Sequence, residues 1–168
     1  LAELCTPIVF GDAEVLLRCA EQTGKSSDFT QMSRDGLESA TEPCVLDLEL
    51  MDPNQLQPGV ISPASGQATF GYVIEAIDAC LAQSVHAVVT CPANKEALQS
   101  AGVPHPGHTE IFAERTQTEK FCMAFLSDKI NCSLVTVHAG YEQVPGLLNE
   151  RRIAEVIELT RETHKKLL

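Results

Sequence analysis

Apolar residues along the chain follow helical spacing in some segments and form strand-length runs in others. Residues 66–83 form the clearest predicted helix, because apolar side chains recur there at three- and four-residue spacing, and a shorter helix is predicted at residues 13–21. Apolar runs at residues 7–10 and 86–91 have the length of buried strands, and residues 44–50 alternate loosely like a further strand. A buried strand directly after a helix is typical of a parallel sheet with helices on its faces. The pattern therefore predicts an α/β fold.

Prolines and capping residues set the limits of the other predicted elements. Three prolines make residues 52–65 irregular, so Ser65 is predicted to cap the helix that follows. No internal domain boundary stands out, and we treat residues 1–168 as one incomplete α/β segment. The remaining predicted elements are a short helix at 95–100 ending at Gly102, a helix beginning near Thr109, an antiparallel pair of strands at 121–126 and 132–137, and a helix at 150–168 capped by Asn149.

Composition narrows the class of protein. The net charge of −11 repels phosphate backbones, so nucleic acid is not an expected partner. No apolar run approaches the roughly 20 residues that a membrane span needs. Seven scattered cysteines without a CxxC pair favour a reduced, cytoplasmic protein. The chain lacks an initiator Met and a signal peptide, and we expect it to be part of a longer one.

Lys95 stands at the start of a predicted helix, shortly after the apolar run at 86–91. Ligands of open α/β sheets bind at the carboxyl ends of the strands, and the first turn of a helix favours anions. Lys95 is therefore a candidate for binding a phosphate or carboxylate group. The alternative is an ordinary exposed lysine.

His108 and Thr109 follow a loop that contains two prolines and a glycine. These residues restrict the loop, so the histidine is held on a defined backbone. Thr109 is predicted to cap the next helix. An imidazole and a hydroxyl at this place suit the oxygens of a phosphorylated substrate. The alternative is a capped loop whose histidine only packs.

His138 ends the predicted strand at 132–137. Neutral imidazole is the commonest side-chain ligand of divalent metals. One histidine does not make a metal site, so any further ligands would lie elsewhere in the fold or on another chain. His86 and His105 are interpreted as structural. The nucleotide-binding motifs GxGxxG and GxxxxGK[ST] are absent, and cofactor-binding residues stay unassigned.

Three segments together resemble a known enzyme family. TCPANKEAL at residues 90–98, GHTE at 107–110 and TVH at 136–138 resemble the 4-hydroxythreonine-4-phosphate dehydrogenase family, and the resemblance covers nearly the whole chain. It implies a three-layer α/β/α part of a two-domain subunit, similar to isocitrate and isopropylmalate dehydrogenases, that works as a homodimer.

The same resemblance implies an activity and roles for the candidate residues. It implies metal-dependent oxidation of 4-phosphohydroxy-L-threonine by NAD or NADP, giving a β-keto acid that loses carbon dioxide, in pyridoxal phosphate biosynthesis. His108 and Thr109 would contact the substrate, and Lys95 would be a catalytic charge beside it. His138 would be one of three histidine ligands of a divalent ion (Zn, Mg or Co) shared across the dimer interface.

Departures from the family pattern keep other functions open. Residues 139–141, AGY, replace a short apolar and proline segment that usually follows the metal histidine. Threonate or erythronate 4-phosphate, or a dihydrodiol, is therefore an alternative substrate. The family's amino-terminal motif and its second half are absent, so we expect these residues alone to be inactive. A non-catalytic module that keeps only a phosphate-binding pocket is the alternative from another class.

Overall fold

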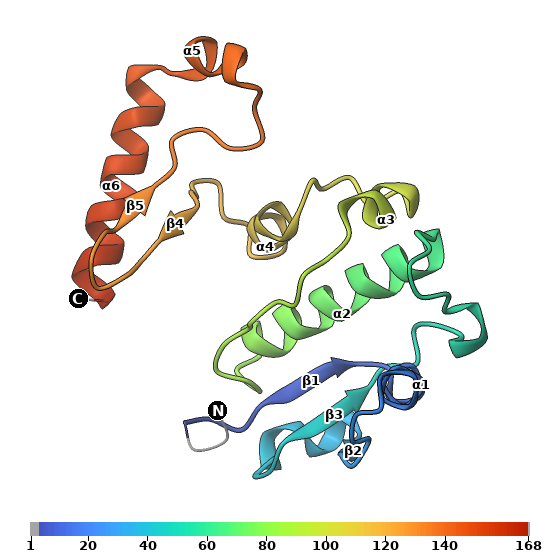
Figure 1. Cartoon of the computed structure of the whole chain (residues 1–168). Coiled ribbons are helices and arrows are strands. Elements are labelled where there is room, and N and C mark those ends of the chain that lie inside the picture. Colours follow the sequence, from blue (N-terminus) through green and yellow to red (C-terminus); the bar gives the residue numbers. More distant parts are fainter. Residues whose placement is uncertain (1–3, 168) are drawn as a thin grey trace. The chain divides into compact units, whose positions relative to one another are not determined.

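The computed structural model describes residues 4–167, and these divide into two compact units, the first ending at Arg115 and the second beginning at Thr116 (Figure 1). No feature of the sequence pattern indicated this division. Each unit is described by itself below.

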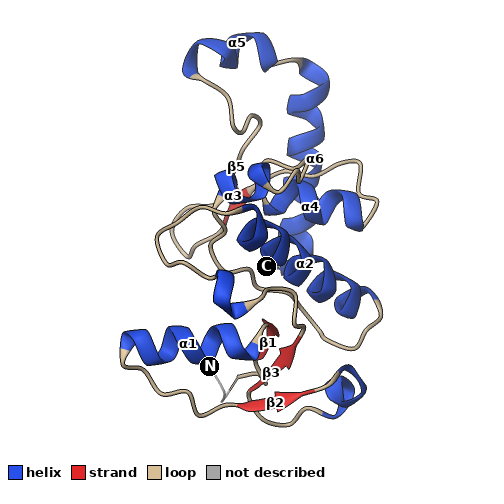
Figure 2. Ribbon diagram, turned by 90° about the vertical axis from the view of Figure 1, so that its right-hand side faces the viewer, coloured by secondary structure: helices blue, strands red, loops and turns tan. Residues whose placement is uncertain are grey.

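The first unit contains a parallel sheet, which confirms the predicted α/β class. Its strands are β1 (Ile8–Gly11), β2 (Thr30–Met32) and β3 (Cys44–Asp47), in the order β1-β3-β2 (Figure 2). β3 is the central strand, with Ile8 and Thr30 on either side of Cys44. The side chains of its first three residues are buried. Apolar residues at these central positions therefore hold the sheet within the unit.

Two helices pack against this sheet. α1 (Ala13–Thr23) follows β1 and contacts β3, and it ends at Gly24, whose φ of 62° is the left-handed conformation common after helices. α2 (Pro63–Leu81) contacts β1, and in both ribbon views it lies on the β1 side of the sheet. Two short 3-10 helices, η1 (Arg34–Ser39) and η2 (Pro53–Gln55), lie between these elements in the chain.

α2 begins earlier than the sequence pattern predicted. Ser62, not Ser65, is the cap, since its Oγ accepts a hydrogen bond from the Ser65 backbone N–H at 3.1 Å. Pro63 stands at the first helical position, where a missing N–H costs nothing. The prediction that this proline lies in an irregular segment was therefore wrong.

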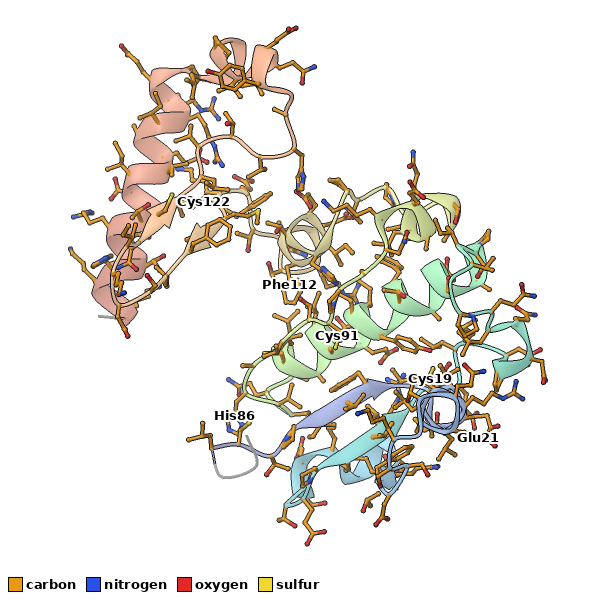
Figure 3. All side chains as sticks on the ribbon, viewed as in Figure 1. Cys19, Glu21, His86, Cys91, Phe112 and Cys122 are labelled. Atoms are coloured by element: carbon orange, nitrogen blue, oxygen red, sulfur yellow. The ribbon has the colours of Figure 1, made fainter. Side chains whose placement is uncertain are left out.

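The predicted buried strand at 86–91 is not formed. This segment joins α2 to α3 (Lys95–Ser100) without regular structure, and the Val89 side chain is 94% exposed. His86 and Cys91 mark the segment in Figure 3. A strand needs a neighbouring strand to receive its backbone hydrogen bonds, and within residues 4–167 none pairs with it. Apolar composition alone therefore does not make this segment a strand.

α4 (His108–Arg115) completes the first unit, close to the predicted start at Thr109. Large side chains of β3, α2, α3 and α4 are fully buried here: Leu46, Ile77, Leu98 and Ile111.

The second unit confirms the predicted antiparallel pair, although its strands β4 (Ala124–Phe125) and β5 (Cys132–Ser133) are shorter than predicted. The other elements are η3 (Tyr141–Gln143), α5 (Val144–Leu147) and α6 (Glu150–Leu167). The Asn149 side chain accepts from the Arg152 backbone N–H at 2.9 Å, so the predicted cap of α6 is confirmed. Among the apolar side chains of α6, Val156 is buried, whereas Ile153 and Ile157 are exposed. Across residues 4–167, no helix combines the length and the apolar character needed to span a membrane.

Candidate active site

Lys95 is the first residue of α3. The helix starts here because the Asn94 side chain accepts a hydrogen bond from the Ala97 backbone N–H at 2.9 Å. Ala97 and Leu98 are buried, whereas the Lys95 side chain is exposed. The lysine therefore stands at a defined helix start, although the strand that was predicted to precede it is not formed.

Gly66 lets α3 approach the first turns of α2. A Cβ placed on Gly66 would lie 2.0 Å from the carbonyl oxygen of Ala97 and 3.0 Å from the Cβ of Ala101. A contact of 2.0 Å with backbone is impossible, so only glycine permits this packing. The position of Lys95 thus depends on a glycine in another helix.

His108 and Thr109 lie in the first turn of α4 and are half-buried. The Ile111 N–H donates to the carbonyl oxygen of Gly107 at 3.4 Å, so Gly107 occupies the capping position. The prediction that Thr109 caps this helix was therefore wrong, because the first helical hydrogen bond begins two residues earlier. Both candidate side chains nevertheless lie at the helix start.

Two contacts with α2 hold α4 in place. Ile111, which is 1% exposed, packs in a core cluster with Val73 and Ile77 of α2. Near the end of the helix, the Arg115 guanidinium makes two hydrogen bonds of 2.6 and 2.5 Å to the carboxylate of Asp78. These hydrogen bonds lower the pKa of the Asp78 carboxyl from its ordinary value. His108 and Thr109 therefore stand on a helix that is held against α2 at its middle and at its last residue.

His105 also has a packing role. Its ring stacks on Phe70 of α2, with ring centroids 6.4 Å apart, and its Nε2 lies 2.6 Å from a carboxylate oxygen of Glu114. These contacts hold the loop before His108 against two helices, in agreement with its structural interpretation.

Lys95 and the first turn of α4 lie around the same point, Gly107. A Cβ placed on Gly107 would be 3.9 Å from Cε of Lys95 and 3.6 Å from Oε2 of Glu110. The structure therefore brings together the lysine and the histidine-threonine turn, which the sequence separates by a loop. It also adds the carboxylate of Glu110 to them.

His138 belongs to the second unit. The predicted strand leading to it ends at Ser133, so His138 lies in an irregular segment beyond β5, where its side chain is exposed. The strand is short because its partner β4 offers only two paired positions. The φ of His138 is +54°, a left-handed conformation that is uncommon outside glycine. Backbone strain of this kind concentrates at functional sites.

The described residues do not supply a complete metal site. Between residues 4 and 167, no three His, Cys, Asp or Glu side chains gather in a way that could hold a metal ion. An exposed imidazole on a constrained backbone does fit the chemistry of one metal ligand.

Comparison with known proteins decides the family. The model of the family described as pyridoxal phosphate biosynthetic protein PdxA matches residues 3–168. The chain belongs to the PdxA family. A protein from Oceanobacillus iheyensis, provisionally named D-threonate 4-phosphate dehydrogenase, is 39% identical over 167 residues, which are 97% of this chain and 50% of the relative. The 4-hydroxythreonine-4-phosphate dehydrogenase of Desulfosudis oleivorans is 35% identical over 167 residues, which are 98% and 49% of the two chains.

Solved PdxA structures agree with this assignment. A crystal structure of 4-hydroxythreonine-4-phosphate dehydrogenase from Klebsiella pneumoniae superposes with a TM-score of 0.82 and 30% identity, over 95% of this chain and 49% of that one. PdxA dehydrogenases have the isocitrate dehydrogenase-like fold, so the predicted fold similarity is confirmed. The chain spans about half the length of the curated relatives that it matches.

Sequence reasoning missed one residue that the structure places at this candidate site. Glu110 belongs to the GHTE segment on which the resemblance rested, yet nothing in the pattern distinguished it from an ordinary acidic residue in the first turn of a helix. Its spacing of three residues from Gly107 was a usable signal, because residues three apart lie on the same face of a helix. Its nearness to Lys95 required the packing of both α3 and α4 on α2.

Proposed function

We propose that the whole protein is a PdxA-type dehydrogenase that oxidises a hydroxyl group of a four-carbon phosphorylated acid with NAD or NADP. The leading substrate is 4-phosphohydroxy-L-threonine, which would place the enzyme in pyridoxal phosphate biosynthesis, in the cytoplasm. The observation that carries the proposal is the position of Lys95 and the His108 turn around Gly107, in a chain that the family model matches over residues 3–168.

In this proposal, the first unit binds the phosphate end of the substrate. The imidazole of His108 and the hydroxyl of Thr109 donate hydrogen bonds to phosphate oxygens from the first turn of α4. The ammonium of Lys95 adds positive charge beside the substrate. Because the chain as a whole has a net charge of −11, attraction for a phosphate has to come from individual basic residues of this kind. Since α4 is fixed against α2, the substrate is oriented by a rigid element.

His138 is proposed as one of three histidine ligands of a divalent ion, with the other ligands outside these residues. The site would be shared across a homodimer interface. When bound, zinc, magnesium or cobalt would stabilise negative charge on substrate oxygens, and the nicotinamide would take up the electrons of the oxidation.

A second substrate has its own support. The Oceanobacillus relative is named for D-threonate 4-phosphate, and residues 139–141 depart from the segment that usually follows the metal histidine. D-Threonate 4-phosphate carries the same phosphate end but a hydroxyl in place of the amino group. Both substrates would use His108 and Thr109 in the same way.

A direct assay tests the proposal. The whole protein is incubated with each substrate, NAD or NADP and a divalent ion, and formation of the reduced nicotinamide is followed by its absorbance. We expect metal-dependent turnover of one of the two substrates. Binding of the phosphorylated acids without reduction of nicotinamide would contradict the proposed dehydrogenase activity and would favour a non-catalytic binding module.

A histidine variant tests the metal site. His138→Ala should lower kcat/KM by roughly 100-fold or more, because loss of residues that only support metal ligands already costs 10–100-fold. His164→Ala is the matched control, since it removes another exposed imidazole of the second unit. Equal metal-dependent activity of the two variants would exclude His138 as a ligand.

A further inference from the structure

Glu110 carries a buried oxygen without a hydrogen-bond partner. Its Oε2 is the only buried side-chain oxygen or nitrogen of this kind among the residues that the structure describes. Leaving such a group unpaired destabilises the folded state, and more so when the group is charged. A carboxylate in this place therefore favours a nearby cation.

Two other basic side chains of this region already have carboxylate partners, which leaves Lys95 as the candidate cation for Glu110. Arg115, on the same helix, is held by Asp78, and His105 is paired with Glu114. Lys95 has no ion pair among residues 4–167. A Cβ placed on Gly107 would lie 3.9 Å from Cε of Lys95 and 3.6 Å from the unpaired oxygen of Glu110, and, its two chain neighbours aside, no other described residue has an atom as near.

Gly107 keeps the space between these two groups open. The lysine side chain has four rotatable bonds, so a change of rotamer can bring its ammonium toward the carboxylate without movement of either helix. The packing of α3 on Gly66 and the contacts of α4 with α2 fix the two helix starts. A lysine held by a carboxylate also loses less side-chain entropy when it meets a substrate, since its conformation is already restricted.

We propose that Glu110 is a positioning residue: its carboxylate pairs with Lys95 and holds the ammonium beside His108 and Thr109. The pairing itself needs no ligand. The role in orienting charge toward a phosphorylated substrate rests on the proposed function.

The first experiment tests the pairing without any substrate. The whole protein is labelled with trace acetic anhydride, and the acetylation rate of each lysine is measured by mass spectrometry. Glu110→Gln keeps the size of the side chain and removes its charge, so Lys95 should react about threefold faster, as expected for the loss of a partly exposed ion pair. Glu110→Asp, which keeps the charge with a shorter reach, should give a smaller increase.

Two controls make this result specific. Lys25 should react at the same rate in every variant, and Glu96→Gln, which removes an exposed carboxylate next to Lys95 in the sequence, should leave the Lys95 rate unchanged. An unchanged Lys95 rate in Glu110→Gln would overturn the pairing.

The second experiment tests positioning by a double-mutant cycle on kcat and KM. Glu110→Gln should lower kcat/KM roughly tenfold when Lys95 is present, and less than about twofold in a Lys95→Met background. Equal losses in both backgrounds would show that Glu110 acts through α4 alone and would overturn the positioning role. If the whole protein turns over neither substrate, the proposed function fails, and the acetylation experiment still decides the pairing.

Discussion

At the scale of single residues, Asp12 stands out because it is a buried acidic side chain that needs hydrogen-bond donors around it. Its side chain is only 4% exposed, and it accepts hydrogen bonds from the backbone N–H groups of Leu50 and Met51 at 2.9 and 2.7 Å and from the hydroxyl of Tyr72 at 2.7 Å. Three donors compensate for the loss of water around a buried carboxylate. They join the start of α1, the segment after β3 and α2 at one point.

Tyr72 should make the stability of the protein sensitive to alkaline pH. Burial, the hydrogen bond to Asp12 and the charge of Asp12 raise the pKa of the Tyr72 hydroxyl above its ordinary value. A raised pKa means that the neutral hydroxyl stabilises the fold fully below about pH 10, where an unfolded tyrosine ionises. This stability is lost as the pH rises above that value.

Tyr72→Phe removes this contribution. We expect it to lower the free energy of unfolding at pH 7 by about 1.5–3 kcal/mol, as for a hydrogen bond to a charged group. Urea denaturation at pH 7 and pH 10.5 should show a smaller pH-dependent loss in the variant than in the wild type. Tyr141→Phe is the matched control, since Tyr141 is 92% exposed and is the only other tyrosine. Identical behaviour of the two variants would contradict the role of Tyr72.

At the scale of elements, the packing of α3 on α2 sets the candidate site. The two helices meet at Gly66, where the backbone of Ala97 occupies the space of a side chain. α3 has only six residues, too few to be stable alone, so its position comes from this contact and from the burial of Ala97 and Leu98. Lys95 is therefore placed by tertiary packing.

Gly66→Ala should displace α3. Because the added Cβ would lie 2.0 Å from a carbonyl oxygen, we expect a loss of about 1–3 kcal/mol in the free energy of unfolding and a raised KM. Gly71→Ala, in the same helix, is the control, since its Cβ would meet only the end of the Leu50 side chain, and alanine favours a helix interior. Urea denaturation followed by circular dichroism would measure the free energy of unfolding of both variants. Equal effects would show that the contact with Ala97 is not what makes Gly66 necessary.

At the scale of the whole molecule, apolar side chains remain exposed in both units. Val89, Phe125, Ile130 and Ile157 are more than half exposed. The chain also spans about half the length of its curated relatives. Where such side chains form a continuous surface, that surface is typical of an interface.

These 168 residues on their own should therefore bind a hydrophobic dye and lack activity. We expect stronger fluorescence of the dye with this chain than with a whole PdxA protein at equal concentration, and no metal-dependent reduction of nicotinamide. Turnover by the isolated chain would show that the site is not divided. Weak dye binding would show that the exposed side chains do not form a continuous apolar surface.

Local patterns determined much of the fold. The helix periodicity of residues 66–81 and the capping of α6 by Asn149 depend on neighbouring residues in the chain, and both were predicted from the sequence. The capping of α3 by Asn94 is local in the same way. The segment around His108 was predictable for the same reason, because prolines and glycine restrict the backbone locally. The roles of Lys95, His108, Thr109 and His138 stay predictions.

Tertiary structure decided what depends on partners that are distant in the sequence. Residues 86–91 have the composition of a strand, yet a strand forms only where another strand accepts its hydrogen bonds. The division into two units had no local signal. Lys95 and Glu110 both lie near Gly107 because Gly66 lets α3 approach α2. By itself, the sequence thus predicted which residues would carry chemistry, and only the packing of the helices placed Lys95 and Glu110 around the same glycine.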